Sequence, residues 1–305
     1  MLMGDAVQGS LVENGKPAVT GYGLFVVLHS LCRTDRFQGH DLEVKRAYPN
    51  RYDYRRVVSW LLKERFIRPD VDFFDCTAAS TPDTMARSHV FRVNAIADGS
   101  AEEITGIVDP FCYISHMSAM QRYGLTNRIP EALMLSTPKQ WKDAAHDRMQ
   151  RDYCDIQAPD EYRFPLSRIG WPDRIRQRPI ACHTSQRAPV LRDIRDSHAR
   201  ISAIGETFVQ MLDRPELCGG MSHVVEVWQE HAKTYLREII PAVERAPERL
   251  VKLRAGYLLD ERLGVRDPTI SSWKKFAQPG GSQLLDPVRP YVSRRSETWK
   301  ISLNV

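Results

Sequence analysis

The 305-residue sequence has no long hydrophobic run. Its longest uncharged apolar stretch, Gly21 to Cys32, is interrupted by His29. A membrane-spanning helix needs about 20 apolar residues, so none is predicted. The first fifteen residues also lack the charged-then-apolar order of a signal peptide. We therefore expect a soluble, cytoplasmic protein with no membrane partner.

Closely spaced cysteines are also missing. The six cysteines lie at least 28 residues apart, and none forms a Cys-x-x-Cys motif. Structural zinc sites usually draw their ligands from closely spaced pairs, so we predict no metal and no cofactor. Reduced and mostly buried thiols are typical of a cytosolic protein.

The short motifs of common enzyme classes are absent. There is no phosphate-binding Gly-x4-Gly-Lys-Ser/Thr loop, no Gly-x-Gly-x-x-Gly after a predicted strand, and no Gly-x-Ser-x-Gly elbow. His146 and Asp147 resemble the paired ligands of a metal-dependent phosphohydrolase, but neighbouring helical residues point about 100° apart. We predict no enzymatic activity, with a phosphohydrolase that uses His146 and Asp147 as the minor alternative.

Positive charge is concentrated in one stretch. The net charge is +5, and residues 163–200 contain nine arginines but only three acids. The planar arginine fork suits phosphate, although such stretches also serve as solvated surfaces with ion pairs. Five prolines between 159 and 189 exclude a continuous basic helix. The basic patch that we expect to engage RNA, DNA, a nucleotide or an acidic partner comprises Arg163, Arg168, Arg174, Arg176 and Arg178.

The first hundred residues have the order of a small DNA-binding module. Apolar residues at helical spacing predict helices over 22–33 and 53–66, with a short helix over 41–47 between them. Alternating residues predict strands over 71–76 and 88–93, joined by a long loop. Three helices followed by a hairpin favour a winged helix-turn-helix over residues 1–97, although other small α+β domains share this order.

The third predicted helix carries the expected DNA-reading face. Its apolar residues share one face, and polar and basic residues recur on the opposite face. An arginine there can bind guanine with two hydrogen bonds, and phosphate contacts make affinity salt-dependent. The predicted DNA-binding residues are Tyr52, Arg55, Arg56, Ser59 and Lys63 on the helix, with Arg65, Arg87 and Arg92 on phosphates or on the wing.

Residues 98–305 are predicted to form a larger mixed α/β domain that ends in a helical bundle, so the fold class is α+β. After a linker over 98–103, Ser115 is placed to cap a helix over 116–123. A strand over 131–136 leads to a helix that begins at Thr137-Pro138 and runs to Tyr153. Further helices are predicted over 206–213, 222–237 and 247–263, and a final strand over 299–305.

Three blocks of this second region resemble AbiEi-family antitoxins. The first runs from Tyr113 to Thr126 and continues through Ile129-Pro130 and Leu135 to Pro138. A second runs from Glu206 to Gly220 and ends in an Arg-Pro-Glu-x-x-Gly-Gly turn, and the tail over 282–290 and 299–305 is similar to the closing segment of the family. The motif residues concerned are Ser118, Gly124, Leu125, Thr126, Pro215, Glu216, Gly219 and Gly220.

The resemblance implies a bifunctional protein of a type IV toxin–antitoxin system of the abortive-infection, phage-defence kind. An N-terminal winged helix would bind double-stranded DNA at inverted repeats of its own promoter and repress transcription. A C-terminal antitoxin domain would counteract a nucleotidyltransferase-like toxin encoded next door, with no direct contact required.

One departure from the family pattern concerns the wing. The segment from Phe66 to Phe74 lacks the glycine of the family's hydrophobic-x-x-Gly-x-Tyr wing, and the hairpin loop is long. Two further interpretations stay open at this point. One is an antitoxin that acts mainly through the basic region of its C-terminal domain. The other is a solitary DNA- or RNA-binding regulator without a toxin partner.

Overall fold

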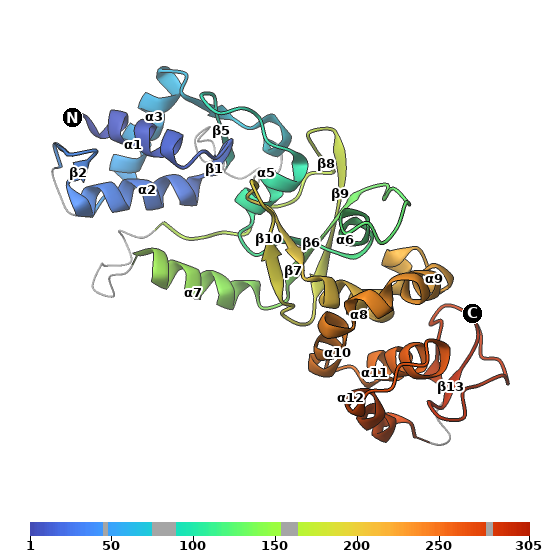
Figure 1. Cartoon of the computed structure of the whole chain (residues 1–305). Helices are drawn as coiled ribbons and strands as arrows, with labels where there is room; N and C mark the ends of the chain where they lie inside the picture. Colours follow the sequence, from blue (N-terminus) through green and yellow to red (C-terminus); the bar gives the residue numbers. More distant parts are fainter. Residues whose placement is uncertain (45–47, 75–89, 154–163, 279–282) are drawn as a thin grey trace. The chain divides into compact units, whose positions relative to one another are not determined.

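The computed structural model describes residues 1–44, 48–74, 90–153, 164–278 and 283–305 (Figure 1). Its contacts define two compact units, each built from separate stretches of chain. The first unit comprises Met1–Cys112, Thr137–Arg187 and Asp193–Ala199, and the second comprises Tyr113–Ser136, Ala188–Arg192 and Arg200–Val305. Helices and strands occur in both units, so the fold is mixed α and β.

The first unit begins with helices that pack beside a small antiparallel sheet. The sheet has the strand order β1-β5-β4, with Val19 opposite Phe91 and Ile67 opposite Val93. In chain order the elements are α1 (Met3–Glu13), β1 (Ala18–Thr20), α2 (Gly21–Thr34), the β2 (Arg36–Phe37) and β3 (His40–Asp41) hairpin, α3 (Arg51–Lys63), β4 (Ile67–Pro69), the 3-10 turn η1 (Val71–Phe73) and β5 (Val90–Val93).

Several elements of this region differ from those predicted. The helices over 22–33 and 53–66 and the strand within 88–93 are present as α2, α3 and β5. Residues 41–44 are not helical, and 45–47 lie outside the described residues. A strand was expected over 71–76, and this is wrong for the described residues 71–74, which are not in a strand. The strand of this region, β4, lies earlier and ends at Pro69. Asp70 then accepts a hydrogen bond from the Asp72 N–H and turns the chain into η1.

Two helices were missed in the first unit. The buried residues of α1 are Ala6, Val7 and Leu11, whose spacing gives only weak helical periodicity. The linker expected over 98–103 is wrong from residue 101 onward, because Ser100 caps helix α5 (Ala101–Val108) by accepting a hydrogen bond from the Glu103 N–H.

Residues from beyond position 97 complete the core of the first unit. Helix α7 (Trp141–Tyr153) ends at Tyr153, whose ring lies 6.3 Å from that of Phe25 between centroids. The Phe164 ring lies 5.0 Å from that of Tyr54 on α3. The domain boundary predicted at residue 97 thus does not coincide with an edge of this core.

The predicted start of the helix at Thr137-Pro138 is wrong, because both residues end strand β7 (Leu133–Pro138) and α7 begins at Trp141. The buried Asp109 carboxylate accepts hydrogen bonds from the Trp141 indole N–H at 3.1 Å and fixes this start. After α7 the first unit continues with the hairpin of β8 (Arg174–Ile175) and β9 (Arg178–Ser185).

The second unit contains four neighbouring strands and a helical part. Its strands are in the order β10-β11-β6-β7, where β6 pairs antiparallel with β7 and β11 pairs parallel with β6. The new elements are β6 (Tyr113–Ile114), α6 (His116–Arg122), β10 (Leu191–Asp193) and β11 (Arg200–Ser202). Ser115 precedes α6 as predicted, but its hydroxyl does not cap the helix and instead accepts a hydrogen bond from the Ser136 hydroxyl at 2.8 Å.

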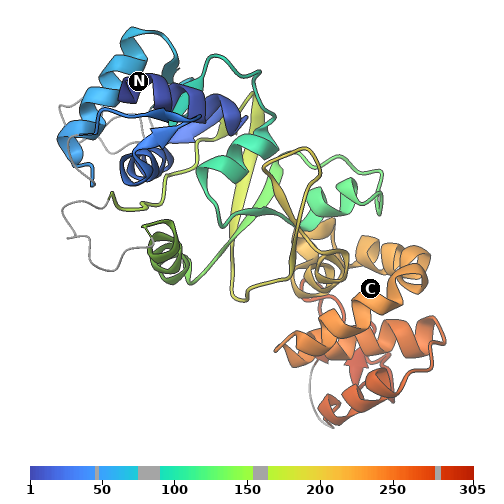
Figure 2. The ribbon, with the colours of Figure 1, turned by 60° about the vertical axis from the view of Figure 1, so that its left-hand side comes forward.

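The helical part follows β11 (Figure 2). Its core includes three fully buried tryptophans, Trp228, Trp273 and Trp299. The helix predicted over 222–237 is divided into α9 and α10 by a 3-10 turn, whereas the one over 206–213 is confirmed as α8. The elements are α8 (Ile204–Asp213), η3 (Pro215–Cys218), α9 (Met221–His231), η4 (Ala232–Tyr235), α10 (Leu236–Arg245), α11 (Arg249–Gly256), the π-helix η5 (Tyr257–Arg262), α12 (Pro268–Ser272), η6 (Trp273–Phe276), β12 (Gln283–Leu284) and β13 (Ile301–Ser302). Within the described part of the chain, no helix is long and apolar enough to cross a membrane.

Helices α8 and α10 approach each other at Gly205. A Cβ at this position would lie 2.1 Å from the backbone oxygen of Glu238 on α10. We expect Gly205→Ala to lower the free energy of unfolding by about 1–3 kcal/mol, because the two backbones must separate. Thermal unfolding followed by circular dichroism measures this, with Glu238→Ala, which keeps the carbonyl, as the near-neutral control. Equal stability of the two variants would contradict the close contact.

Candidate functional site

Helix α3 is fixed at its N-terminus by a reciprocal cap. The Asn50 side-chain oxygen accepts hydrogen bonds from the N–H groups of Tyr52 at 2.9 Å and Asp53 at 3.0 Å. The Asp53 carboxylate accepts the Asn50 N–H at 3.1 Å, so the first turn is a complete capping box. The buried side chains Tyr54, Val57, Val58 and Leu61 hold the helix against the core of the first unit.

The opposite face of α3 is exposed and basic. Tyr52, Arg55, Arg56, Ser59 and Lys63 all lie on the solvent side, as their spacing predicted, and Tyr52 is 71% exposed. The one acid within α3 is part of the capping box. The face therefore combines an aromatic ring with cationic side chains, a composition suited to an anionic polymer.

Two further exposed arginines lie on α3 and on the strand that follows it. Arg51 is the first residue of α3, and Arg68 lies in β4, with both side chains exposed. Sequence reasoning missed Arg68 because it placed the strand several residues later. The predicted Arg65 is also exposed, in a left-handed conformation with φ of 54°, and its carbonyl accepts a hydrogen bond from the Asn94 side chain at 2.6 Å.

Arg92 is another of the predicted DNA-binding residues. It lies in β5 and forms an ion pair with Asp98 at 2.8 Å, with the arginine side chain only 26% exposed. An internally paired arginine has to break that ion pair before it can bind phosphate. The remaining predicted residue, Arg87, lies outside the described residues.

Two of the four described members of the basic patch predicted around residues 163–178 are paired with acids within the protein. Arg176 forms ion pairs with three aspartates, and Arg178 pairs with Glu102 at 2.9 Å. The described members, Arg168, Arg174, Arg176 and Arg178, belong to the first unit, and Arg163 lies outside the described residues. Arg168 and Arg174 are exposed, but each donates a hydrogen bond inside the protein, to Thr137 at 2.9 Å and to the Gln177 carbonyl at 3.0 Å.

His146 and Asp147 are exposed on α7, and the His146 ring is hydrogen-bonded to the Gln150 amide at 2.9 Å. Across the described ranges, no group of three or more His, Cys, Asp or Glu side chains is arranged to hold a metal ion. The described geometry therefore adds no third ligand to this pair.

The second unit brings two of the sequence blocks together. The Thr126 hydroxyl lies 3.0 Å from Nε2 of His223 on α9, and it accepts the Arg128 N–H at 3.1 Å. The Arg128 guanidinium donates to the carbonyl of Gly219 at 3.3 Å. The sequence motifs contain Thr126 and Gly219 in separate blocks, and they assign no role to Arg128.

The other motif residues shape this junction. Gly124, Gly219 and Gly220 have positive φ angles of 67°, 85° and 87°, which glycine adopts without strain. Ser118 accepts the Met134 N–H at 2.9 Å and ties α6 to β7. The remaining motif residues are Leu125, which is buried, Pro215, which begins η3, and Glu216, which pairs with Arg214.

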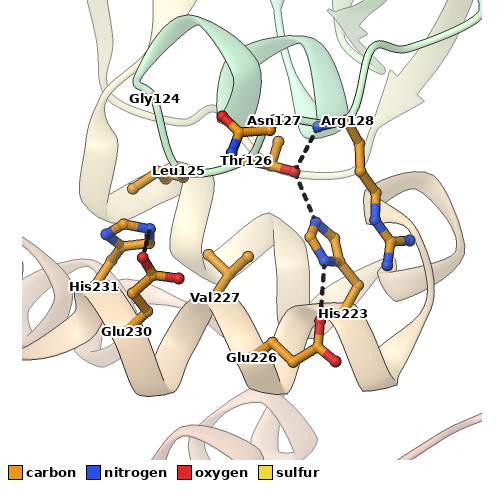
Figure 3. Close-up of a pocket in the computed structure, with 10 residues that line it drawn as sticks. All are labelled: Gly124, Leu125, Thr126, Asn127, Arg128, His223, Glu226, Val227, Glu230 and His231. Carbon is orange, nitrogen blue, oxygen red and sulfur yellow. Dashed lines mark hydrogen bonds and ion pairs between the residues drawn. The ribbon is translucent and has the colours of Figure 1, made fainter.

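A polar pocket of about 420 Å³ opens beside this junction (Figure 3). Its lining residues come from the loop that follows α6 and from α9. They are Gly124, Leu125, Thr126, Asn127, Arg128, His223, Glu226, Val227, Glu230 and His231. Burial and the nearby Arg128 lower the pKa of His223, while Glu226, whose Oε2 is 3.5 Å from Nδ1, acts in the opposite direction.

Comparison with known proteins leaves the chain without a family assignment. No family model and no curated protein matches the sequence. Among solved structures, the chain is similar to the crystal structure of the RV2827C protein from Mycobacterium tuberculosis, with a TM-score of 0.46 and 11% sequence identity. The match covers 98% of this chain and 90% of that one, and similarity at this level implies no shared function.

We expect the imidazole of His223 to titrate below 6.5, and Arg128→Gln to raise its pKa without restoring that value, because burial is the larger cause. The folded protein holds the ring neutral, so this group lowers the free energy of unfolding as pH falls below about 6.5. A proton NMR titration of the ring measures both values, with Arg237→Gln as a control. A pKa above 6.5 in the unmodified protein would show that Glu226 dominates instead.

Proposed function

We propose that this protein is a DNA-binding transcriptional autorepressor and the antitoxin of a type IV toxin–antitoxin system, as its resemblance to AbiEi antitoxins suggests. The basic face of α3 is the observation that carries the DNA-binding part. A capped, well-packed helix that presents an aromatic ring and several cations to solvent suits insertion into the major groove.

The order of elements also supports a winged helix-turn-helix. The helices α1, α2 and α3 are combined with strand β1 between the first two and with β4 and β5 after the third. Pairing of β1 with β5 places these strands in one antiparallel sheet. In this arrangement α3 is the recognition helix, and β4 with β5 forms the base of the wing.

The DNA-binding proposal is tested with duplex DNA from upstream of the gene and a scrambled duplex, by fluorescence anisotropy at two salt concentrations. We expect Arg56→Ala combined with Lys63→Ala to weaken binding to the native duplex at least tenfold. The slope of log affinity against log salt should shrink in magnitude by about 1 for each phosphate contact removed.

The matched control replaces two exposed basic residues on other helices of the same unit, Arg33→Ala on α2 with Lys142→Ala on α7, and should bind like the unmodified protein. Unchanged affinity in the α3 variant would exclude this helix as the recognition element. Equal, weak binding of the unmodified protein to both duplexes would overturn the repressor proposal.

The antitoxin activity is assigned to the second unit, because the two motif blocks meet there around Thr126, Arg128 and Gly219. A Cβ on Gly219 would lie 2.8 Å from Cε of Met117. The backbone φ of 85° at this position is also one that a residue with a Cβ rarely adopts. Since two of its four described arginines, Arg176 and Arg178, are paired with acids, the basic patch gives less support to the interpretation in which that patch neutralises the toxin.

We expect Gly219→Ala to abolish rescue from the toxicity of the neighbouring gene product in a co-expression growth assay, while DNA binding is retained. Gly264→Ala is the matched control, because Gly264 also has a positive φ but has no neighbour within 4 Å of the added Cβ. The α3 double variant should keep the rescue. A neighbouring gene product without toxicity would instead favour the solitary regulator.

A further inference from the structure

The tip of the β8–β9 hairpin is tied to the strand that follows α3. Arg176 and Gln177 form the two-residue turn of this hairpin, with Ile175 paired to Arg178. Both turn residues have positive φ angles, 50° and 64°, although neither is glycine. Residues of this type hold such a conformation only when their surroundings fix it, and here the contacts of Arg176 do so.

The Arg176 guanidinium is surrounded by three carboxylates. It holds Asp70 through two hydrogen bonds, from Nη2 at 2.7 Å and from Nη1 at 3.0 Å, and its Nε donates to Asp98 at 3.0 Å. Nη1 also pairs with Asp72, whose carboxylate accepts the Arg176 backbone N–H at 2.9 Å. The Arg176 side chain is 16% exposed, and that of Asp70 is 1% exposed.

The contacts of Arg176 combine opposite charge, short hydrogen bonds and burial, which together make an ion pair strong. A carboxylate as buried as Asp70 needs a charged, hydrogen-bonded partner, and the planar arginine fork supplies two parallel bonds that lysine cannot. Burial by itself lowers the pKa of Arg176, but the bonds and charges of the aspartates outweigh it and raise the pKa above its ordinary range. The guanidinium therefore stays charged, and the cluster stays paired.

Two of the aspartates follow the two strands that come after α3 in the chain. Asp70 directly follows β4, and its N–H donates to the Val90 carbonyl of β5 at 3.0 Å. Asp98 follows β5 and also pairs with Arg92 within that strand. One guanidinium, 106 residues beyond Asp70 and 78 beyond Asp98, thus holds the end of β4 and the segment after β5 together.

We propose that Arg176 is a positioning residue for DNA binding. It fixes β4 and β5 relative to α3, so that Arg65, between α3 and β4, faces the same nucleic acid as α3, and it neutralises aspartates that would repel phosphate. This inference rests on the proposed DNA-binding function. It also implies that the DNA-binding module needs the chain beyond residue 97, because its two strands are held from residue 176.

The test compares Arg176→Gln with Arg178→Gln in the full-length protein. Arg178 belongs to the same hairpin but pairs with Glu102. We expect Arg176→Gln to weaken binding to the upstream duplex at least tenfold at 0.1 M salt, with a smaller loss at higher salt, because salt screens carboxylate–phosphate repulsion. Arg178→Gln should stay within about twofold, and Arg176→Lys should fall between the two.

Hydroxyl-radical footprinting separates positioning from general stability. Arg176→Gln should lose protection of the backbone that flanks the half-site and keep protection at the groove contacted by α3, whereas simple unfolding would remove both. Equal losses of affinity in the two glutamine variants, or an unchanged footprint in Arg176→Gln, would overturn the proposal. Arg176→Lys serves as the second variant if Arg176→Gln does not fold.

Hydrogen exchange distinguishes a failure of the positioning role of Arg176 from a failure of the proposed DNA-binding function. If the unmodified protein binds neither duplex, the DNA-binding function fails, and the positioning role fails with it. Faster amide exchange in Arg176→Gln at Ile67, Arg68 and residues 90–93, with α1 and α2 unchanged, would still show that Arg176 holds the two strands. Unchanged exchange at those amides would show that Arg176 does not hold the two strands.

Discussion

The aromatic contact between Tyr54 and Phe164 is the interaction on which the arrangement of the first unit depends. Tyr54 is on the buried face of α3, and its ring lies 5.0 Å from that of Phe164, which in turn lies 5.5 Å from that of Phe25 on α2. These rings bury a large apolar area and pack in tilted arrangements that aromatic pairs favour. The exposed face of α3 is presented to solvent because the opposite face is anchored here. The residues that anchor it come from two regions more than a hundred positions apart.

Electrostatics divides the arginines into two groups with different roles. Arg92, Arg176 and Arg178 are paired with acids inside the first unit, whereas Arg51 and Arg56 on α3 and Arg68 on β4 are exposed. Exposed ion pairs contribute little to stability, but the Arg176 cluster includes an almost fully buried carboxylate, so the loss of its partner is costly. A stretch that is strongly basic in the sequence is therefore partly structural. The number of arginines in residues 163–200 therefore overstates the unpaired positive charge of this stretch.

In the second unit, buried polar side chains connect elements that are distant in the sequence. Ser115, Ser136 and Gln210 are almost fully buried, and Gln210 on α8 accepts the His116 N–H at 3.0 Å. His116 has a positive φ of 50°, a conformation that this hydrogen bond supports. Buried groups of this kind are costly unless each is hydrogen-bonded, so they fix the position of α6 relative to α8. The junction of Thr126 with His223 involves the loop that follows the other end of α6.

Local patterns in the sequence determined much of the first unit and of α8. Apolar spacing placed α2 and α3, and the same spacing identified the exposed face of α3 from Tyr52 to Lys63, because a helix repeats every 3.6 residues whatever surrounds it. Tertiary structure decided the rest. Thr137 and Pro138 have the residue types of a helix start but end a strand, since α7 begins only where Trp141 reaches Asp109. The partners of Arg92 and Arg176, and the meeting of Thr126 with His223, were also outside the reach of the sequence. These contacts join residues far apart in the chain, and their energies depend on burial that only the folded protein creates.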